Sequence, residues 1–254
     1  MPSCLPESNQ VRFDHVIIVD WSANSTPKTG ADSIWYCHDG SVHNPATRHQ
    51  AMREITRLAQ SLKGRVLLGF DFPLGFAHYR IPWPLLTELI EDAEDNTNNR
   101  FAVAAELNRR LTGGPSPFWG CPAKHAGRFL TTTKPPVPLP ERATEQRGAK
   151  PPWKLAYPGT CGSQSLTGIP HLQRLRTALE DCSVWPFEEP VTRYVIAEIY
   201  PSLCGAPPKN TCKDEWQVRT LQAQLSLPAA LNRFLSVKLP PSARAEGWIL
   251  GLEP

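Results

Sequence analysis

Two stretches decide the fold: HVIIVD at residues 15–20 and VLLGFD at residues 66–71. Each is a short apolar run rich in aliphatic side chains, which is the pattern of a strand buried on both faces of a sheet. Each run also ends in an acid, Asp20 in the first and Asp71 in the second. The two stretches therefore predict neighbouring strands at the centre of a sheet, with a carboxylate at the end of each.

The remaining segments are arranged around these two strands. Residues 33–37 and 41–43 predict two strands joined by a turn, and YVIAEIY at residues 194–200 predicts a further buried strand. Helical spacing of apolar residues predicts helices within 45–63, 83–111 (one helix or two), 170–181, 213–225 and 228–235. We therefore expect an α/β protein with a mixed five-stranded sheet, flanking helices and a long, Pro-rich, basic insertion. Three antiparallel strands followed by parallel ones is the element order of the ribonuclease H-like fold.

Composition narrows the class of protein. The 254 residues include 27 prolines, and 27 Lys and Arg stand against 24 Asp and Glu, a net charge of +3. This charge excludes a histone-like polycation, and the prolines predict long loops. No apolar stretch is long enough to cross a membrane, and the first ten residues lack the pattern of a signal peptide. Seven scattered cysteines without a Cys-x-x-Cys pair favour thiols in a reducing cytoplasm over a disulfide framework or a zinc site.

Four acids lie where metal-dependent active sites carry them. Asp20 and Asp71 end strands, Glu198 lies within a third strand, and Asp214 begins a predicted helix. The carboxyl ends of parallel strands meet at one edge of a sheet, where α/β proteins bind ligands. Carboxylates held that close repel one another unless a cation neutralises them, and oxygen ligands suit Mg²⁺ or Mn²⁺. We expect these four acids to hold such a metal, although each alone is also compatible with a helix cap or a strand-end turn.

Several motifs resemble those of DUF429, an uncharacterised bacterial family of predicted nucleases with a ribonuclease H-like fold. They are VDWSANSTPKTG, GFDFPLGF, AEIYPSL and KDEWQVR, and the segments PFWGCP, PPWKLAYPGTCGSQSLTGIP and VWPF resemble a subgroup of that family. The resemblance spans roughly residues 14–225 and implies that the four acids named above are catalytic. Asp214 and Glu215 are adjacent in KDEW, which leaves open which of them faces the metal. We favour Asp214, which shares a helix face with Gln217.

The loop after Asp20 is rich in groups that contact phosphate. Ser22 and Lys28 lie in SANSTPKTG, where hydroxyls, amides and one cation occur together. We expect both residues to bind substrate, although the same composition also suits a solvated loop. Sugar kinases and actin-like proteins likewise begin with an acid-ended strand and a phosphate-holding turn. They need a second Gly-rich phosphate loop, which the sequence lacks, so an ATP-dependent phosphotransferase is the alternative.

A basic segment covers residues 124–154. Seven cations and two acids give it a charge of +5. Aromatic residues flank it, and cations interleaved with aromatics are typical of a surface that binds nucleic acid. Arg142, Arg147 and Lys150 are the candidate phosphate contacts, and a solvated, proline-rich excursion is the alternative. Gln164, in a Gly-Ser-Gln turn expected before a helix that opens near residue 169, is a further candidate for substrate binding.

The residues together favour a metal-dependent nuclease or related phosphodiester-processing hydrolase that acts on nucleic acid or a nucleotide. The alternatives are the phosphotransferase and a non-catalytic module that binds nucleic acid or protein. We expect a ribonuclease H-like domain over residues 11–225, an insertion within it at about 76–165, and a helical extension over 226–254. DNA, RNA and small nucleotides all stay open as substrates, and no pattern indicates an oligomeric state.

Overall fold

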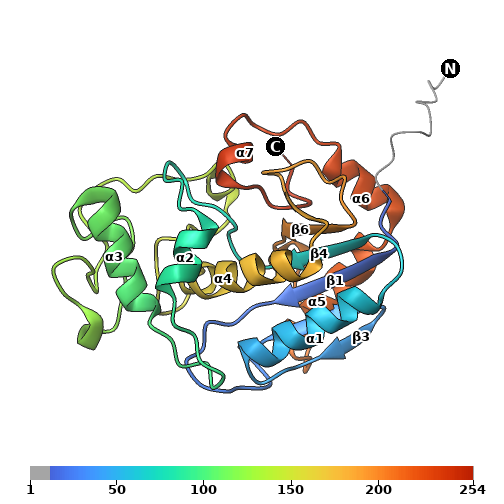
Figure 1. Cartoon of the computed structure of the whole chain (residues 1–254), viewed down its shortest axis with the longest axis horizontal. Helices are drawn as coiled ribbons and strands as arrows, with labels where there is room; N and C mark the ends of the chain where they lie inside the picture. Colours follow the sequence, from blue (N-terminus) through green and yellow to red (C-terminus); the bar gives the residue numbers. More distant parts are fainter. Residues whose placement is uncertain (1–11, 254) are drawn as a thin grey trace.

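The computed structural model describes residues 12–253, in which helices cover both faces of a mixed six-stranded sheet (Figure 1). The expectations that concern residues 1–11 lie outside the described residues. The strands are β1 His15–Asp20, β2 Trp35–His38, β3 Ser41–His43, β4 Val66–Phe70, β5 Cys182–Trp185 and β6 Tyr194–Glu198. Their order across the sheet is β3-β2-β1-β4-β6-β5. The first three strands are antiparallel neighbours, and β1, β4, β6 and β5 run parallel.

The helices of the described residues mostly match the ranges that apolar spacing predicts. They are α1 Arg48–Ser61, α2 Trp83–Leu89, α3 Arg100–Thr112, α4 Gly162–Leu179, α5 Lys213–Leu225, α6 Pro228–Leu235 and α7 Ala243–Glu246, with short 3-10 helices at Ala123–His125, Glu145–Arg147 and Pro201–Cys204. The stretch predicted as one helix or two is two, α2 and α3. None of the helices in the described part of the chain is long and apolar enough to cross a membrane.

Two hydrophobic cores lie on opposite faces of the sheet. Strand β6 contributes side chains to both cores. Tyr194 and Ile196 belong to one, and Val195 and Ala197 belong to the other. Helices α1 and α4 cover the first face, and α5 and α6 cover the second. In Figure 1, α1 and α4 lie side by side across the near face of the sheet, and α5 lies behind it. This confirms the prediction that β6 is covered on both sides.

The expected five-stranded sheet is wrong by one strand, β5. Its sequence, CSVW, is only four residues long, and all four residues are buried. Parallel neighbours usually need a crossover of a dozen or more residues. Here the eight residues 186–193 connect β5 to β6, because β5 is only four residues long and the connection has a short distance to cover. The mixed α/β sheet is confirmed, while its assignment to the ribonuclease H-like fold stays a prediction.

Helix α4 begins eight residues earlier than the sequence predicts. Pro170 suggested a helix start, since proline is favoured in a first turn. In the structure Pro170 lies inside a helix that runs from Gly162. The Gly-Ser-Gln segment is therefore the first turn of α4 rather than a separate turn before it. This shift brings Gln164 to the end of a long buried helix, next to the carboxyl ends of β1 and β4.

The residues after α5 complete the second core. Trp248 and Leu250 are buried in it together with Leu231 of α6. The backbone N–H of Leu250 donates to the carbonyl of Glu198 at 2.8 Å, so the chain near its C-terminus pairs with the end of β6. This segment therefore lies at the edge of the sheet that carries the predicted acids.

Candidate active site

The register of β1 and β4 brings Asp20 and Asp71 together. Val19 pairs with Phe70 in the parallel ladder, so the residue after each stands at the same edge of the sheet. The backbone N–H of Asp71 donates to the carbonyl of Val19 at 3.3 Å, which continues the ladder to the acid itself. The N–H of Trp21 donates to Oδ1 of Asp71 at 2.6 Å and orients that carboxyl.

The carboxyl groups of Asp20 and Asp71 lie close enough for each to shift the pKa of the other. Burial raises the pKa of Asp71 to about 6, against the opposing hydrogen bonds from Asp20 and from the Trp21 N–H. Burial, and then the charge of Asp71, raise the pKa of Asp20 well above its usual range. Lys213 opposes this shift only in part. The pair is therefore a place where two full negative charges are costly without a cation.

Asp214 is the third acid of the site. It lies in the first turn of α5, and its Oδ2 accepts a hydrogen bond from the backbone N–H of Asp32 at 2.7 Å. Its charge contributes to the raised pKa of both Asp20 and Asp71. The neighbouring Glu215 instead pairs with Arg219 at 3.2 Å. Of the two adjacent acids in KDEW, Asp214 therefore faces the site, together with Gln217.

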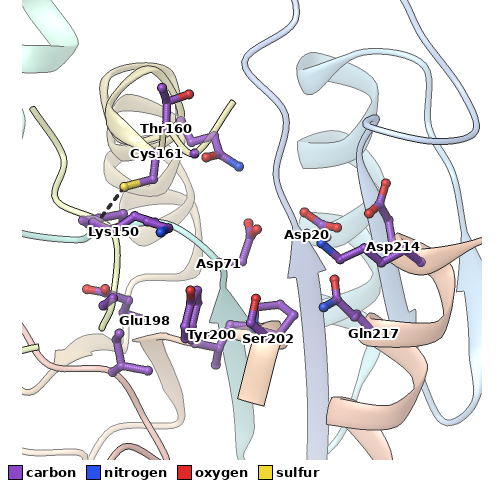
Figure 2. Close-up of a pocket in the computed structure, with 18 of the residues that line it drawn as sticks. Asp20, Asp71, Lys150, Thr160, Cys161, Glu198, Tyr200, Ser202, Asp214 and Gln217 are labelled. Atoms are coloured by element: carbon purple, nitrogen blue, oxygen red, sulfur yellow. Dashed lines mark hydrogen bonds between the residues drawn. The ribbon is translucent and has the colours of Figure 1, made fainter. Parts of the chain in front are cut away.

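These acids line a cavity of about 260 Å³ at the carboxyl edge of the sheet. Figure 2 shows Asp71 at its centre, Asp20 and Asp214 on one side, and Lys150, Cys161 and Glu198 on the other. Cys161 donates through Sγ to the carbonyl of Lys150 at 3.1 Å, which holds the basic segment against the start of α4. The six cysteines of residues 12–253 are free thiols.

The expectation that a metal is the partner of Glu198 is wrong. Arg142 of the basic segment donates from Nη1 to Oε2 at 2.7 Å and from Nη2 to Oε1 at 2.9 Å. The backbone N–H of Leu74 donates to the same Oε2 at 3.1 Å. Both oxygens of Glu198 are thus occupied by protein donors, and its side chain is almost fully buried. Glu198 positions the cavity wall, because it ties β6 to the basic segment and to the chain after Asp71.

Arg142 is correspondingly not a phosphate contact. Its side chain is 1% exposed, and it also binds Glu145 from Nε at 2.7 Å. Although burial opposes its charge, Glu198 and Glu145 raise the pKa of Arg142 above its ordinary value. A guanidinium enclosed by two carboxylates has no free donor face for a nucleic acid. The sequence showed a cation in a basic run, and no local signal revealed that its partner lies on a distant strand.

The other predicted substrate contacts divide into two groups. Lys150 is exposed and lines the cavity of the acids, and Gln164 lines it too while donating from Nε2 to the carbonyl of Trp21 at 2.7 Å. Ser22 lines an adjacent cavity of about 500 Å³ that shares Asp20, Gln164 and Asp214 with the first. Lys28 and Arg147 line neither cavity. Lys28 lies 3.7 Å from Asp32, and Arg147 stacks over the ring of Trp248.

Sequence reasoning missed Arg100 of the second cavity and noted Tyr157 only as one of the aromatic residues that flank the basic segment. Arg100 is the first residue of α3, within a stretch where acids outnumber cations, so it stood out from no pattern. Tyr157 is 60% exposed and has a φ of +74°, a left-handed conformation that is uncommon for a tyrosine. Its place just after the basic segment is the sequence signal that pointed to Tyr157.

The donor chemistry of the Asp20–Asp71 pair fits a hard divalent cation. The ligands are carboxylate oxygens, and among the residues that the structure describes neither acid has a Lys, Arg or His partner within 4.0 Å. Two other groups, His49–Asp92–His171 and His15–His38–Asp39, bring one ligand atom each within 4.8 Å of one another. In the first of these, Arg48 already binds both oxygens of Asp92, so a cation would have to displace a buried guanidinium.

Comparison of the chain with protein-family models, with curated proteins and with solved structures found no match in any of the three. The resemblance to DUF429 therefore stays a prediction.

Proposed function

We propose that the protein is a metal-dependent hydrolase of phosphodiester bonds, with its active site at Asp20, Asp71 and Asp214. The observation that carries this proposal is the close pair of carboxyl groups at the ends of two parallel strands, which line a cavity and have no cationic partner among the described residues. Such a pair is electrostatically incomplete. A divalent cation, Mg²⁺ or Mn²⁺, would complete it.

The arrangement of the sheet supports the same proposal. An antiparallel β1-β2-β3 unit followed by parallel β4 and β6 is the core that a ribonuclease H-like fold requires, with β5 added at the edge. Asp20 and Asp71 occupy the carboxyl ends of its two central strands. A cation bound there would polarise a phosphodiester and activate a water molecule.

The protein's own side chains would have distinct tasks. Asp20 and Asp71 would bind the cation in their ionised forms and supply the ligand oxygens. Asp214, which accepts a hydrogen bond from the N–H of Asp32, would provide a third carboxylate on the same side of the cavity as Asp20. Lys150 and Lys213 line the same cavity and would attract the phosphate of the substrate. Glu198 and Arg142 would hold the wall in place without touching the reacting atoms.

Hydrolysis of bis(p-nitrophenyl) phosphate and of single-stranded DNA and RNA, with Mg²⁺ or Mn²⁺ and with EDTA, tests the proposal. We expect cleavage that requires the metal and is lost in Asp71→Asn. The matched control is Glu88→Gln, an exposed acid on α2 that lines neither cavity, which should leave the rate unchanged. Cleavage that is insensitive to EDTA, or that survives Asp71→Asn in a folded protein, would overturn the proposal.

A further inference from the structure

The second cavity is lined by a half-buried cation, Arg100, which has no anionic partner among the described residues. The guanidinium of Arg100 donates from Nε to Ser163 Oγ at 3.0 Å, and from Nη1 to Ser25 Oγ at 2.7 Å and Asn98 Oδ1 at 2.9 Å. All three acceptors are neutral. Among residues 12–253, Arg100 has no carboxylate within 4.0 Å, and its Nη2 makes no hydrogen bond. Its Cζ lies 4.5 Å from the centre of the Phe101 ring, which packs the apolar face of the guanidinium.

This isolation has a measurable electrostatic cost. Burial, with the nearby charge of Arg48, lowers the pKa of Arg100 to about 10. A desolvated cation is stabilised most by an anion that reaches its free donor, and planar guanidinium nitrogens match phosphate oxygens. The arginine is held rigidly by three hydrogen bonds, so an incoming phosphate would meet a preorganised donor rather than a mobile side chain.

The cavity beside Arg100 is large enough for a small phosphorylated ligand. The cavity of about 500 Å³ is within the range of small-ligand sites and is continuous with the acid site through Asp20 and Asp214. Ser163, in the first turn of α4, accepts from Arg100 and lines the same cavity as Asp20 and Asp214. At the rim, Tyr157 exposes an aromatic face on which a base can stack. The lining of the cavity thus combines a cation, two acids shared with the first cavity and an exposed aromatic ring.

We propose that this second cavity is a subsite for a nucleoside phosphate, in which Arg100 binds the phosphate and Tyr157 stacks on the base. The inference rests on the proposed function, because it supplies the nucleotide that flanks the bond to be cleaved at Asp20 and Asp71. Two sources share this chemistry: a free nucleotide, and a nucleotide unit within a single strand. The subsite should bind its phosphate without a divalent cation, since Arg100 rather than the acids provides the charge.

Binding measured by calorimetry in EDTA tests the subsite independently of catalysis. The probes are adenosine 5′-monophosphate, adenosine, ribose 5-phosphate and a 5′-phosphorylated trinucleotide. We expect the monophosphate to bind at least tenfold more tightly than adenosine. Arg100→Gln should weaken the monophosphate by 10- to 100-fold, and Arg57→Gln, an exposed arginine on α1 outside the cavity, should leave binding unchanged. Tyr157→Ala should weaken the monophosphate and spare ribose 5-phosphate.

The outcomes separate the subsite from the proposed active site. If Asp71→Asn abolishes hydrolysis but binds the monophosphate as the unmodified protein does, both proposals stand. Equal binding of adenosine and its monophosphate, or of the unmodified protein and Arg100→Gln, overturns the subsite whatever the hydrolysis assay shows. Should Arg100→Gln fail to fold, Arg100→Lys keeps the charge and removes the planar fork, and unchanged affinity in it would equally overturn the subsite. Tighter binding of the trinucleotide than of the monophosphate would assign the source as a strand.

Discussion

The guanidinium of Arg142 and the carboxylate of Glu198 bind each other through two hydrogen bonds, at 2.7 and 2.9 Å, beneath the candidate active site. The two residues are 56 positions apart in the chain. One lies in the basic segment and the other ends β6, so the pair joins the long insertion to the sheet. Arg142, which the sequence predicts to contact nucleic acid, instead points into the protein and stabilises the wall of the cavity.

The first prediction concerns the stability that this pair provides. Glu198→Gln should lower the free energy of unfolding by about 3 kcal/mol, because it removes one carboxylate from a buried ion pair. Arg142→Met should cost more, since it leaves both Glu198 and Glu145 buried without a cation. Denaturant unfolding measures both values. The control is Glu94→Gln, which removes the exposed pair with Arg53 and should leave the free energy of unfolding almost unchanged. Equal small effects for all three variants would contradict the role assigned to Arg142.

The second prediction concerns pH. The folded-state pKa of Asp71 is raised to about 6 from an unfolded value near 4, so the folded protein binds the proton more tightly. That stabilisation is fully present below about pH 4 and is lost as the pH rises through 6. Asp71→Asn removes the titration, so its stability relative to the unmodified protein should rise by roughly 1–3 kcal/mol between pH 4 and pH 7. Chemical denaturation across this range measures the difference.

The stability of the unmodified protein has to be compared with that of Asp71→Asn, because other groups titrate over the same pH range. Burial lowers the pKa of His171 and of His38, which makes the folded protein more stable as the pH rises through the same range. These histidines are present in both proteins, so their contribution cancels in the difference. A pH profile of Asp71→Asn that runs parallel to that of the unmodified protein would show that Asp71 is not held in its protonated form.

The third prediction concerns metal binding without substrate. Mg²⁺ or Mn²⁺ at 100 times its Kd should stabilise the protein by about 2.7 kcal/mol, which raises Tm by several degrees. The increase should vanish in Asp20→Asn and Asp71→Asn and persist in Glu198→Gln, whose carboxylate oxygens are occupied by Arg142 and Leu74. Differential scanning calorimetry at fixed pH provides the measurement. A Tm increase that survives Asp71→Asn would place the metal elsewhere in the protein.

The fourth prediction concerns the exposed part of the basic segment. Lys150 lines the acid cavity, so Lys150→Ala should weaken binding of a single-stranded oligonucleotide and reduce the slope of log K against log salt by about 0.7. Lys124→Ala, in the same segment but outside both cavities, should leave the slope unchanged. Fluorescence anisotropy between low and moderate salt measures both variants. An equal change in the two slopes would mean that the segment acts through its overall charge and not through the cavity.

The local pattern of the chain determined the parts of the fold that depend on nearby residues. Apolar runs ending in Asp20 and Asp71 specify two central strands, because a buried parallel strand needs side chains that are apolar on both faces. The spacing of apolar residues specified α5 and α6 almost to the residue. The same two runs also predicted which acids would meet, since carboxyl ends of parallel strands share one edge of the sheet.

Tertiary structure decided the partners of the buried charges. The partner of Glu198, a metal or an arginine, depended on where the insertion folds back onto the sheet. The residues around Glu198 in the strand do not specify a partner 56 positions away. The same holds for Arg100, whose isolation follows from the packing of α3 beside the start of α4. Strand periodicity and helix spacing depend on residues that are close in the sequence. The pairing of buried charges depends on segments that are far apart in the sequence, because an unpaired charge is costly in the low dielectric of the core and needs a partner of opposite charge.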